Sequence, residues 1–307
     1  MAIRRSKKNL FLSLVMLVVL AACGGGDGGG GGDAGGEAKG ELTVGVSGAF
    51  AENQIVAEMY AQVLEDAGYT VDRQLDIGSR EISQTAFNNG EIDVVPEYLA
   101  SLLLFLDPDA TATGNASENA EKVRTALQGK NAVLLEPSGA NDTNAIVVTG
   151  ETAEERNLEK VSDLAPIAGE LRFGGPPECP ERPFCIPGLR DTYGITFREF
   201  RPLDTGPLTV AALEGGEIDV ALLFSTSSVI EDKGWVLLED DKNLQAAENI
   251  TPLVRQDVVN DEVTELLNGV SEALTTENIT ELNARVEIDN EDPADVAQEF
   301  LEDEGLL

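Results

Sequence analysis

A phrase of five residues occurs twice in this chain, and it constrains the fold more than any other feature. Gly-Glu-Ile-Asp-Val stands at residues 90–94 and again at residues 216–220. Each copy follows a segment with helical spacing of apolar residues and leads into an apolar, strand-like run. Either the phrase recurs by coincidence in an acidic protein, or the chain holds two lobes of like construction. In α/β sheets of this kind, ligands bind outside the carboxyl ends of the strands. In the second case, therefore, we expect the strands that follow the two copies to end at one shared cleft.

The segments around the first copy alternate between strand and helix patterns, which predicts a mainly parallel α/β sheet. The expected strands are 42–46, 70–77 and 92–95, and the expected helices are 52–67 and 82–88. Later patterns predict strands at 132–135 and 145–148, an extended segment at 250–255 that returns to the first lobe, and tail helices at 261–274 and 294–301.

The N-terminus has the segment order of a secretory signal peptide. Basic residues precede an apolar run over 10–20, which is shorter than the roughly 20 residues of a membrane span. The run ends in Leu20-Ala21-Ala22-Cys23, which resembles a bacterial lipobox. The alternative is an ordinary signal peptide followed by a chance cysteine, but the Gly-rich stretch after Cys23 favours a lipoprotein with a flexible tether.

We therefore expect a signal peptide at 1–22 and a lipid-anchored, Gly-rich tether at 23–40. Lipid on Cys23 would hold the protein outside the cell, on the outer face of the cell membrane. No later run reaches about 18 continuous apolar residues, so we expect no transmembrane helix.

The charge of the chain limits its partners. Cleavage before Cys23 would remove four basic residues and no acidic one, so the formal charge would move from −35 to −39. So acidic a body repels nucleic acid and anionic lipid surfaces, and we expect no nucleic-acid partner. The acidity has two explanations: a well-solvated surface, or adaptation to high salt, in which screening weakens the repulsion between carboxylates.

The chain contains no histidine, which excludes His-based catalytic triads and His-ligated zinc sites. No spaced carboxylate pair stands out among the 56 acidic residues. We therefore expect no catalytic residues, no metal site, no cofactor and no enzymatic activity. An extracytoplasmic enzyme or receptor on the same fold, acting on another small polar solute, is the alternative.

Cys179 and Cys185 are the only cysteines after Cys23. In an exported protein, two nearby cysteines are most simply a disulfide. They lie in a proline-dense loop, residues 176–187, for which we expect little regular structure. The alternative of a metal site lacks enough soft ligands.

Several segments carry a resemblance to a known family. They are Val44-Gly45-Val46, Phe50-Ala51-Glu52-Asn53, residues 90–98 with their Pro-Glu-Tyr ending, Leu222-Leu223-Phe224-Ser225-Thr226, and Pro252-Leu253-Val254-Arg255. From about Leu42 to Leu307, the chain resembles the substrate-binding lipoproteins of ABC importers for glycine betaine, choline and related osmoprotectants. The Pro-Glu-Tyr segment behind a Gly-Glu-Ile-Asp strand is the most specific of these features.

The resemblance implies an α/β, type II periplasmic-binding-protein fold, with two α/β lobes joined by two hinge crossovers. Lobe 1 would be residues 41–142 and 251–307, and lobe 2 residues 143–250. The lobes would close around a small solute of the quaternary-amine class, and the closed form would deliver it to an ABC permease and its ATPase subunits.

The resemblance also implies a set of binding residues. A quaternary ammonium makes no conventional hydrogen bond, so aromatic faces hold it, each contributing about 0.5–2 kcal/mol. The expected ligand-binding residues are Tyr98, Phe224, Asp142, Ser101, Asn53, Asn144 and Thr226. Asn144 and Val210 stand where the family has further rings, so the cage is thinner than usual, and Asp142 would partly compensate by its negative charge. Alternatively, the rings belong to the core and the polar residues form ordinary turns and caps.

The charge of the chain generates a prediction about stability. The melting temperature of the protein should rise between 0.1 M and 1 M sodium chloride, because the screening length falls from about 10 Å to about 3 Å and self-repulsion weakens. Thermal unfolding at both concentrations measures this. An unchanged or lower melting temperature at 1 M would contradict the prediction.

Overall fold

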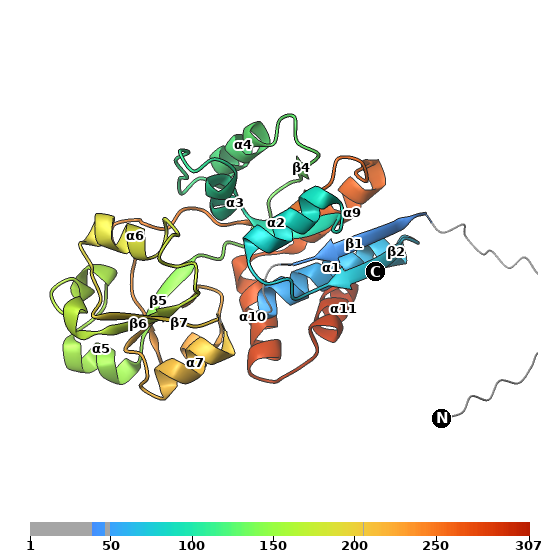
Figure 1. Ribbon diagram of the computed structural model, residues 1–307. Helices are drawn as coiled ribbons and strands as arrows, with labels where there is room; N and C mark the ends of the chain where they lie inside the picture. Colours follow the sequence, from blue (N-terminus) through green and yellow to red (C-terminus); the bar gives the residue numbers. More distant parts are fainter. Residues whose placement is uncertain (1–38, 47–49, 205) are drawn as a thin grey trace, which may run out of the picture. The chain divides into compact units, whose positions relative to one another are not determined.

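The computed structural model describes residues 39–46, 50–204 and 206–307 (Figure 1). The predicted signal peptide, Cys23 and almost all of the predicted tether lie outside these residues. The described part of the chain forms two five-stranded sheets, each covered by helices. None of its helices is long and apolar enough to cross a membrane.

The first sheet has the strand order β2-β1-β3-β10-β4. Its strands are β1 (Glu41–Gly45), β2 (Thr70–Gln74), β3 (Val94–Tyr98), β4 (Val133–Leu134) and β10 (Ile250–Val254). Strand β1 pairs in parallel with β2 and β3, whereas β10 is antiparallel to β3 and β4. The predicted return of the segment 250–255 to the first lobe is therefore confirmed.

Helices cover both faces of the first sheet (Figure 1). One layer holds α1 (Ala51–Asp66), α9 (Asp261–Ala273), α10 (Thr276–Glu287) and α11 (Pro293–Asp303), and the other holds α2 (Arg80–Asn89), α3 (Leu99–Leu106) and α4 (Ala116–Ala126). The strand β3 separates the two apolar cores: Val94 belongs to the first and Val95 to the second. This division follows from the alternation of side chains along a strand.

The second sheet has the order β7-β6-β8-β5-β9. Its strands are β5 (Asn144–Val148), β6 (Arg172–Gly175), β7 (Glu199–Pro202), β8 (Val220–Phe224) and β9 (Val236–Leu237). The helices of this half are α5 (Gly150–Arg156), α6 (Ile186–Gly188), α7 (Pro207–Glu214) and α8 (Val229–Asp232), with short 3₁₀ turns at Val161–Leu164 and Ala168–Glu170 and a π-helical turn at Leu189–Tyr193. Two buried clusters again lie against the sheet.

The repeated phrase plays the same part in both sheets. Gly90 and Gly216 both have a left-handed backbone, with φ of 79° and 64°, and each follows a helix directly before a central strand. A carboxylate from each copy then bonds the neighbouring strand. Asp93 accepts a hydrogen bond from the backbone N–H of Thr43 at 2.9 Å, and Asp219 accepts one from that of Arg172 at 2.7 Å. The recurrence is therefore structural, as two lobes of like construction require.

Two strands differ from the sequence predictions by two residues or more at an end. The strand expected at 70–77 ends at Gln74, and the strand expected at 92–95 begins at Val94 and continues to Tyr98. Pro96 lies inside that strand, opposite Pro252 of β10. Helix α10 was not predicted, because its apolar residues are few among polar ones. Ile279 and Leu282 are its buried anchors.

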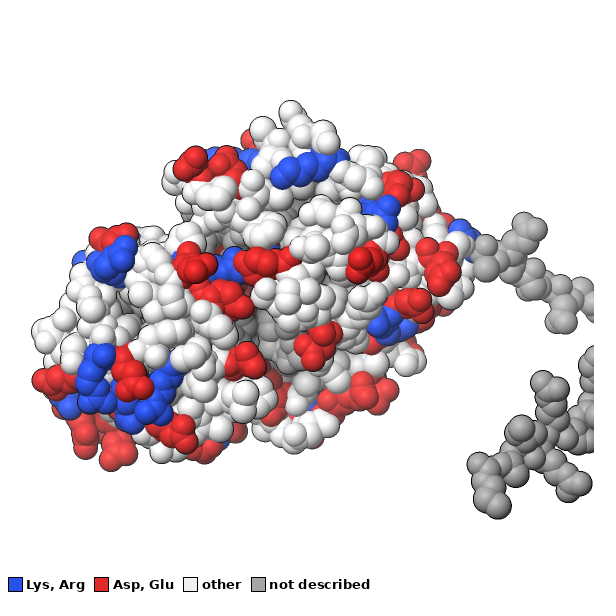
Figure 2. Space-filling view, viewed as in Figure 1, with Lys and Arg blue, Asp and Glu red and all other residues white. Residues whose placement is uncertain are grey.

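The acidic surface predicted from composition is visible on the face shown in Figure 2, where red acidic groups are spread over the described residues and most blue groups lie beside them. The ion pairs are mostly exposed, for example Lys122 with Glu118 and Arg190 with Asp191. Exposed pairs contribute about 0–1 kcal/mol each, so they leave the net self-repulsion largely in place.

The proline-dense loop brings Cys179 and Cys185 together, with their Cα atoms 5.3 Å apart and both side chains buried. This separation lies within the range of disulfides. The remainder of the loop is mainly turns before α6, as the proline content predicts.

We predict that these two cysteines form a disulfide. Thiol labelling of the denatured, unreduced chain, located by peptide mass, should find neither Cys179 nor Cys185 labelled, while prior reduction should expose both. Reduction should lower the free energy of unfolding by about 2–3 kcal/mol, because the closed loop is short. Labelling of both residues without reduction would show the bridge to be absent.

Candidate functional site

Three aromatic rings meet near the ends of the two central strands. Tyr98 ends β3, Phe224 ends β8, and Phe50 stands directly before α1. The centroid of the Phe50 ring lies 6.5 Å from that of Tyr98 and 4.6 Å from that of Phe224. Phe50 thus links the two predicted rings. It belongs to one of the family segments in the sequence, but it was not among the predicted rings of the site.

A buried carboxylate, Glu52, lies beside these rings in the first turn of α1. It is 1 % exposed and accepts hydrogen bonds from the hydroxyl of Tyr98 at 2.7 Å and from the hydroxyl of Thr226 at 2.6 Å. The amide of Asn283 on α10 donates to it at 3.4 Å. Burial raises the pKa of Glu52, and the three donors counteract part of that rise. Glu52 was not among the predicted binding residues.

Thr226 connects Glu52 to a second buried carboxylate, Asp142. Thr226 follows β8, and its backbone N–H donates to Oδ1 of Asp142 at 3.2 Å, while the Ser225 hydroxyl donates to the same oxygen at 3.1 Å. The other oxygen of Asp142, Oδ2, is buried without a hydrogen-bond partner. Burial raises the pKa of Asp142 well above its ordinary value, and the nearby charge of Glu52 raises it further.

Tyr98 is held as a hydrogen-bond donor between α1 and the strands. Its hydroxyl oxygen lies within hydrogen-bond distance of two acceptors, a carboxylate oxygen of Glu52 at 2.7 Å and Oδ1 of Asn53 at 3.1 Å. Burial raises the pKa of the Tyr98 hydroxyl well above its ordinary value, and the charges of Glu52 and Asp142 act in the same direction. Tyr98 therefore stays protonated, and it offers its ring face while its hydroxyl is occupied.

Ser101 bonds a third buried carboxylate, Glu248, and makes no hydrogen bond to Glu52 or Asp142. Its hydroxyl and backbone N–H both donate to Glu248, at 2.5 Å and 3.0 Å. Burial raises the pKa of Glu248 to about 7. Close by, Arg80 donates to Glu97 at 2.9 Å, so its positive charge is already paired. The Arg80–Glu97 pair lies near Tyr98, since the charge of Arg80 acts on the Tyr98 hydroxyl.

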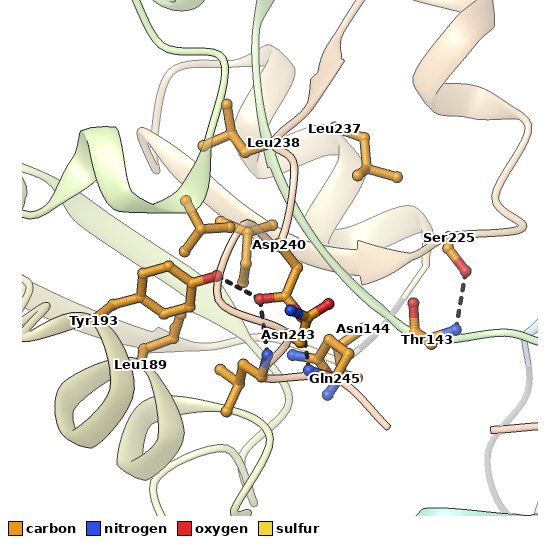
Figure 3. Close-up of a pocket in the computed structure, with 13 residues that line it drawn as sticks. Thr143, Asn144, Leu189, Tyr193, Ser225, Leu237, Leu238, Asp240, Asn243 and Gln245 are labelled. Carbon is orange, nitrogen blue, oxygen red and sulfur yellow. Dashed lines mark hydrogen bonds between the residues drawn. The ribbon is translucent and has the colours of Figure 1, made fainter. Parts of the chain in front are cut away.

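Asn144 faces a separate cavity of about 190 Å³ in the second half of the chain (Figure 3). Its amide donates to the carbonyl of Phe184 at 3.2 Å. Tyr193, which bonds Asp240, forms the opposite wall of this cavity. Val210, which stands at the other position where the family has a ring, belongs to α7 and packs against an apolar cluster of the second sheet.

Of the predicted residues, the structure therefore gathers Tyr98, Asn53, Asp142 and Thr226 around Glu52, and Phe224 joins them through Phe50. Ser101 and Asn144 lie beside other partners. A hollow beside these groups measures about 20 Å³ and is lined by Phe50, Glu52, Phe224, Thr226 and Asn283 among others. Such a volume holds about one water molecule. The described residues contain no cluster of His, Cys, Asp and Glu suited to a metal ion.

Comparison with known proteins agrees with this architecture. Residues 40–303 match the family model described as the substrate-binding domain of ABC-type glycine betaine transport systems. The chain is 31 % identical to a glycine-betaine-binding protein of Pseudomonas aeruginosa, over 84 % of this chain and 86 % of that protein. It is 26 % identical to the glycine betaine-binding protein YehZ of Escherichia coli, over 83 % and 88 % of the two chains.

Solved structures show the same fold. A crystal structure of a glycine betaine/carnitine/choline ABC transporter protein is similar with a TM-score of 0.67 at 25 % identity, covering 86 % of this chain and 99 % of the other. Lactococcal OpuAC, in its closed form with glycine betaine, has a TM-score of 0.61 at 17 % identity and covers 86 % and 96 %. The type II periplasmic-binding-protein fold expected from the sequence is confirmed, and the chain belongs to the family of substrate-binding domains of ABC-type glycine betaine transport systems.

Proposed function

We propose that this protein captures a small solute with a quaternary or otherwise cationic amine head outside the cell and delivers it to an ABC permease. The observation that carries the proposal is the meeting of three aromatic rings and two buried carboxylates at the ends of β3 and β8. Aromatic faces attract a cation that makes no conventional hydrogen bond, and carboxylates strengthen that attraction. Relatives named for glycine betaine binding agree with this chemistry.

The packing of the rings indicates how the ligand enters. Phe50 lies against Phe224 at 4.6 Å, and the adjoining hollow holds about one water molecule. A trimethylammonium group therefore requires these rings to part. Phe50 belongs with α1 and Phe224 with the second sheet, so a hinge between residues 41–142 with 251–307 and residues 143–250 would separate them. Because the two rings belong to different lobes, opening of the lobes would admit the ligand and closure would enclose it.

The hinge motion would also break polar contacts between the two halves. Thr226 donates to Glu52 across them, and Arg182 pairs with Glu81 at 2.6 Å. The Thr226 contact is buried, so a ligand that takes its place must offer Glu52 equal stabilisation. A cation meets that requirement better than a neutral solute does.

We predict that loss of any ring of the site weakens ligand binding. In calorimetry with choline, glycine betaine and carnitine, Phe50→Ala, Tyr98→Ala and Phe224→Ala should each lower the affinity for the ligand that binds best by about 1–3 kcal/mol. Phe224→Tyr should bind better than Phe224→Ala, because it keeps the ring face.

Tyr69→Ala is the control, since it removes a ring that lies near Lys39 and Glu262, away from the site. It should leave the affinity unchanged. If all three ring variants bind as tightly as the wild type, the ligand site lies elsewhere in the molecule.

We also propose that Cys23 carries the lipid that holds the protein on the outer face of the membrane, which the lipobox-like Leu20-Ala21-Ala22-Cys23 supports. We predict that Cys23→Ala moves the protein from the membrane fraction to the soluble fraction of cells. Mass spectrometry of the wild-type N-terminus should find a lipid on Cys23. A variant that fractionates like the wild type, with no lipid on the native N-terminus, would refute the anchor.

A further inference from the structure

We propose that Glu52 and Asp142 make this a site for amine cations without a carboxylate, such as choline, and that the bound cation replaces a proton carried by this pair of carboxylates. The inference rests on the proposed function and specifies its substrate class. It distinguishes a monocation from a zwitterion such as glycine betaine, whose carboxylate must also be accommodated.

The geometry joins two buried anionic groups through one residue. Glu52 and Asp142 are 1 % and 3 % exposed, and a single residue, Thr226, donates to both: its hydroxyl to Glu52 and its N–H to Asp142. The oxygen Oδ2 of Asp142 is buried and has no partner. An unpaired, buried carboxylate oxygen is costly, so it calls for either a proton or a cation.

The same two groups hold a proton more tightly than isolated carboxylates do. Burial disfavours the ionised form of both, and the charge of one disfavours ionisation of the other. Two such carboxylates titrate as a coupled pair, in which one proton is retained to higher pH. The pair therefore carries less than its full negative charge until a cation arrives.

Other charged and titratable groups surround the pair. Glu287 on α10 acts directly on Glu52, and the Tyr98 hydroxyl on β3 donates to it. Arg80 on α2, with Glu97 and Glu248 beside it, acts in turn on Tyr98. Among the described residues, the cationic side chain that acts on Tyr98 is Arg80, and Glu97 already binds it at 2.9 Å. The balance of these charges is negative, which opposes a ligand carboxylate and favours a ligand cation.

The direction of the pH dependence follows from these contacts. A bound cation stabilises the ionised form of both carboxylates, so their pKa falls and a proton leaves on binding. Affinity for the cation is therefore highest above the raised pKa of the pair and decreases as the pH falls through it. The proton passes to the solvent buffer, where it can be counted.

The test is calorimetry on the full-length chain in mild detergent, with choline chloride and glycine betaine as probes. Titrations at pH 7 in two buffers of different ionisation enthalpy measure the protons released, and a second series at pH 5 measures the loss of affinity. We expect choline to bind at least about tenfold more tightly than glycine betaine, with release of up to about one proton. We expect its affinity to fall several-fold at pH 5.

Asp142→Asn is the decisive variant, because an asparagine oxygen can still accept from Ser225 and Thr226. It should abolish proton release and lower the affinity for choline about tenfold or more, while the affinity for glycine betaine stays the same or improves. Asp289→Asn is the matched control. It removes the same charge from an exposed position, so the affinity for both ligands and the release of a proton should stay unchanged.

The outcomes separate this inference from the proposed function. If glycine betaine binds as tightly as choline and the wild-type protein releases no proton, the site binds quaternary amines but the two carboxylates do not select a monocation. If neither amine binds, the proposed function fails and the inference with it. The wild-type measurements decide both questions even if Asp142→Asn does not fold.

Discussion

The hydrogen bonds received by the buried carboxylate of Glu52 connect the two halves of this protein. Tyr98 from the first sheet and Thr226 from the second both donate to it, and Asn283 of α10 donates to Glu52 and to the backbone carbonyl of Thr226. A carboxylate that is 1 % exposed needs such donors to remain stable in the interior. The position of the rings depends on this arrangement, because Phe50 and Tyr98 are placed by the residues that surround Glu52.

The fold could be predicted from the sequence because its signals are local and repeated. Each copy of Gly-Glu-Ile-Asp-Val provides a glycine that ends a helix and an aspartate that bonds the adjacent strand, so the same five residues specify the same turn in both sheets. The helix α10 could not be predicted in this way. Its stability comes from packing against α1 and α11, and such tertiary packing leaves only a weak periodicity in the sequence.

The site was only partly predictable, because its members are distant in sequence and their partners decide their roles. Tyr98, Asp142 and Thr226 were found through the family segments, and the structure gathers them. Ser101 was expected beside the ligand, but Glu248, 147 positions away, takes both of its hydrogen bonds. Conversely, the segment Phe50-Ala51-Glu52-Asn53 pointed to Asn53, whereas the structure makes Phe50 and Glu52 of the same segment central. No residue pattern reveals that a carboxylate 174 positions from Thr226 is its partner.

Hydrogen-bond and ion-pair partners also distinguish the acidic residues that stabilise the fold from those available to bind a ligand. Asp93 and Asp219 have nearly the same sequence context, and both are satisfied by the strand beside them and by an arginine. Asp142 differs, because burial removes it from water while one of its oxygens has no donor. In a chain with 56 acidic residues, negative charge alone carries little information. A carboxylate that is buried and incompletely paired is different, since the folded state tolerates it only with a proton or a cation at hand.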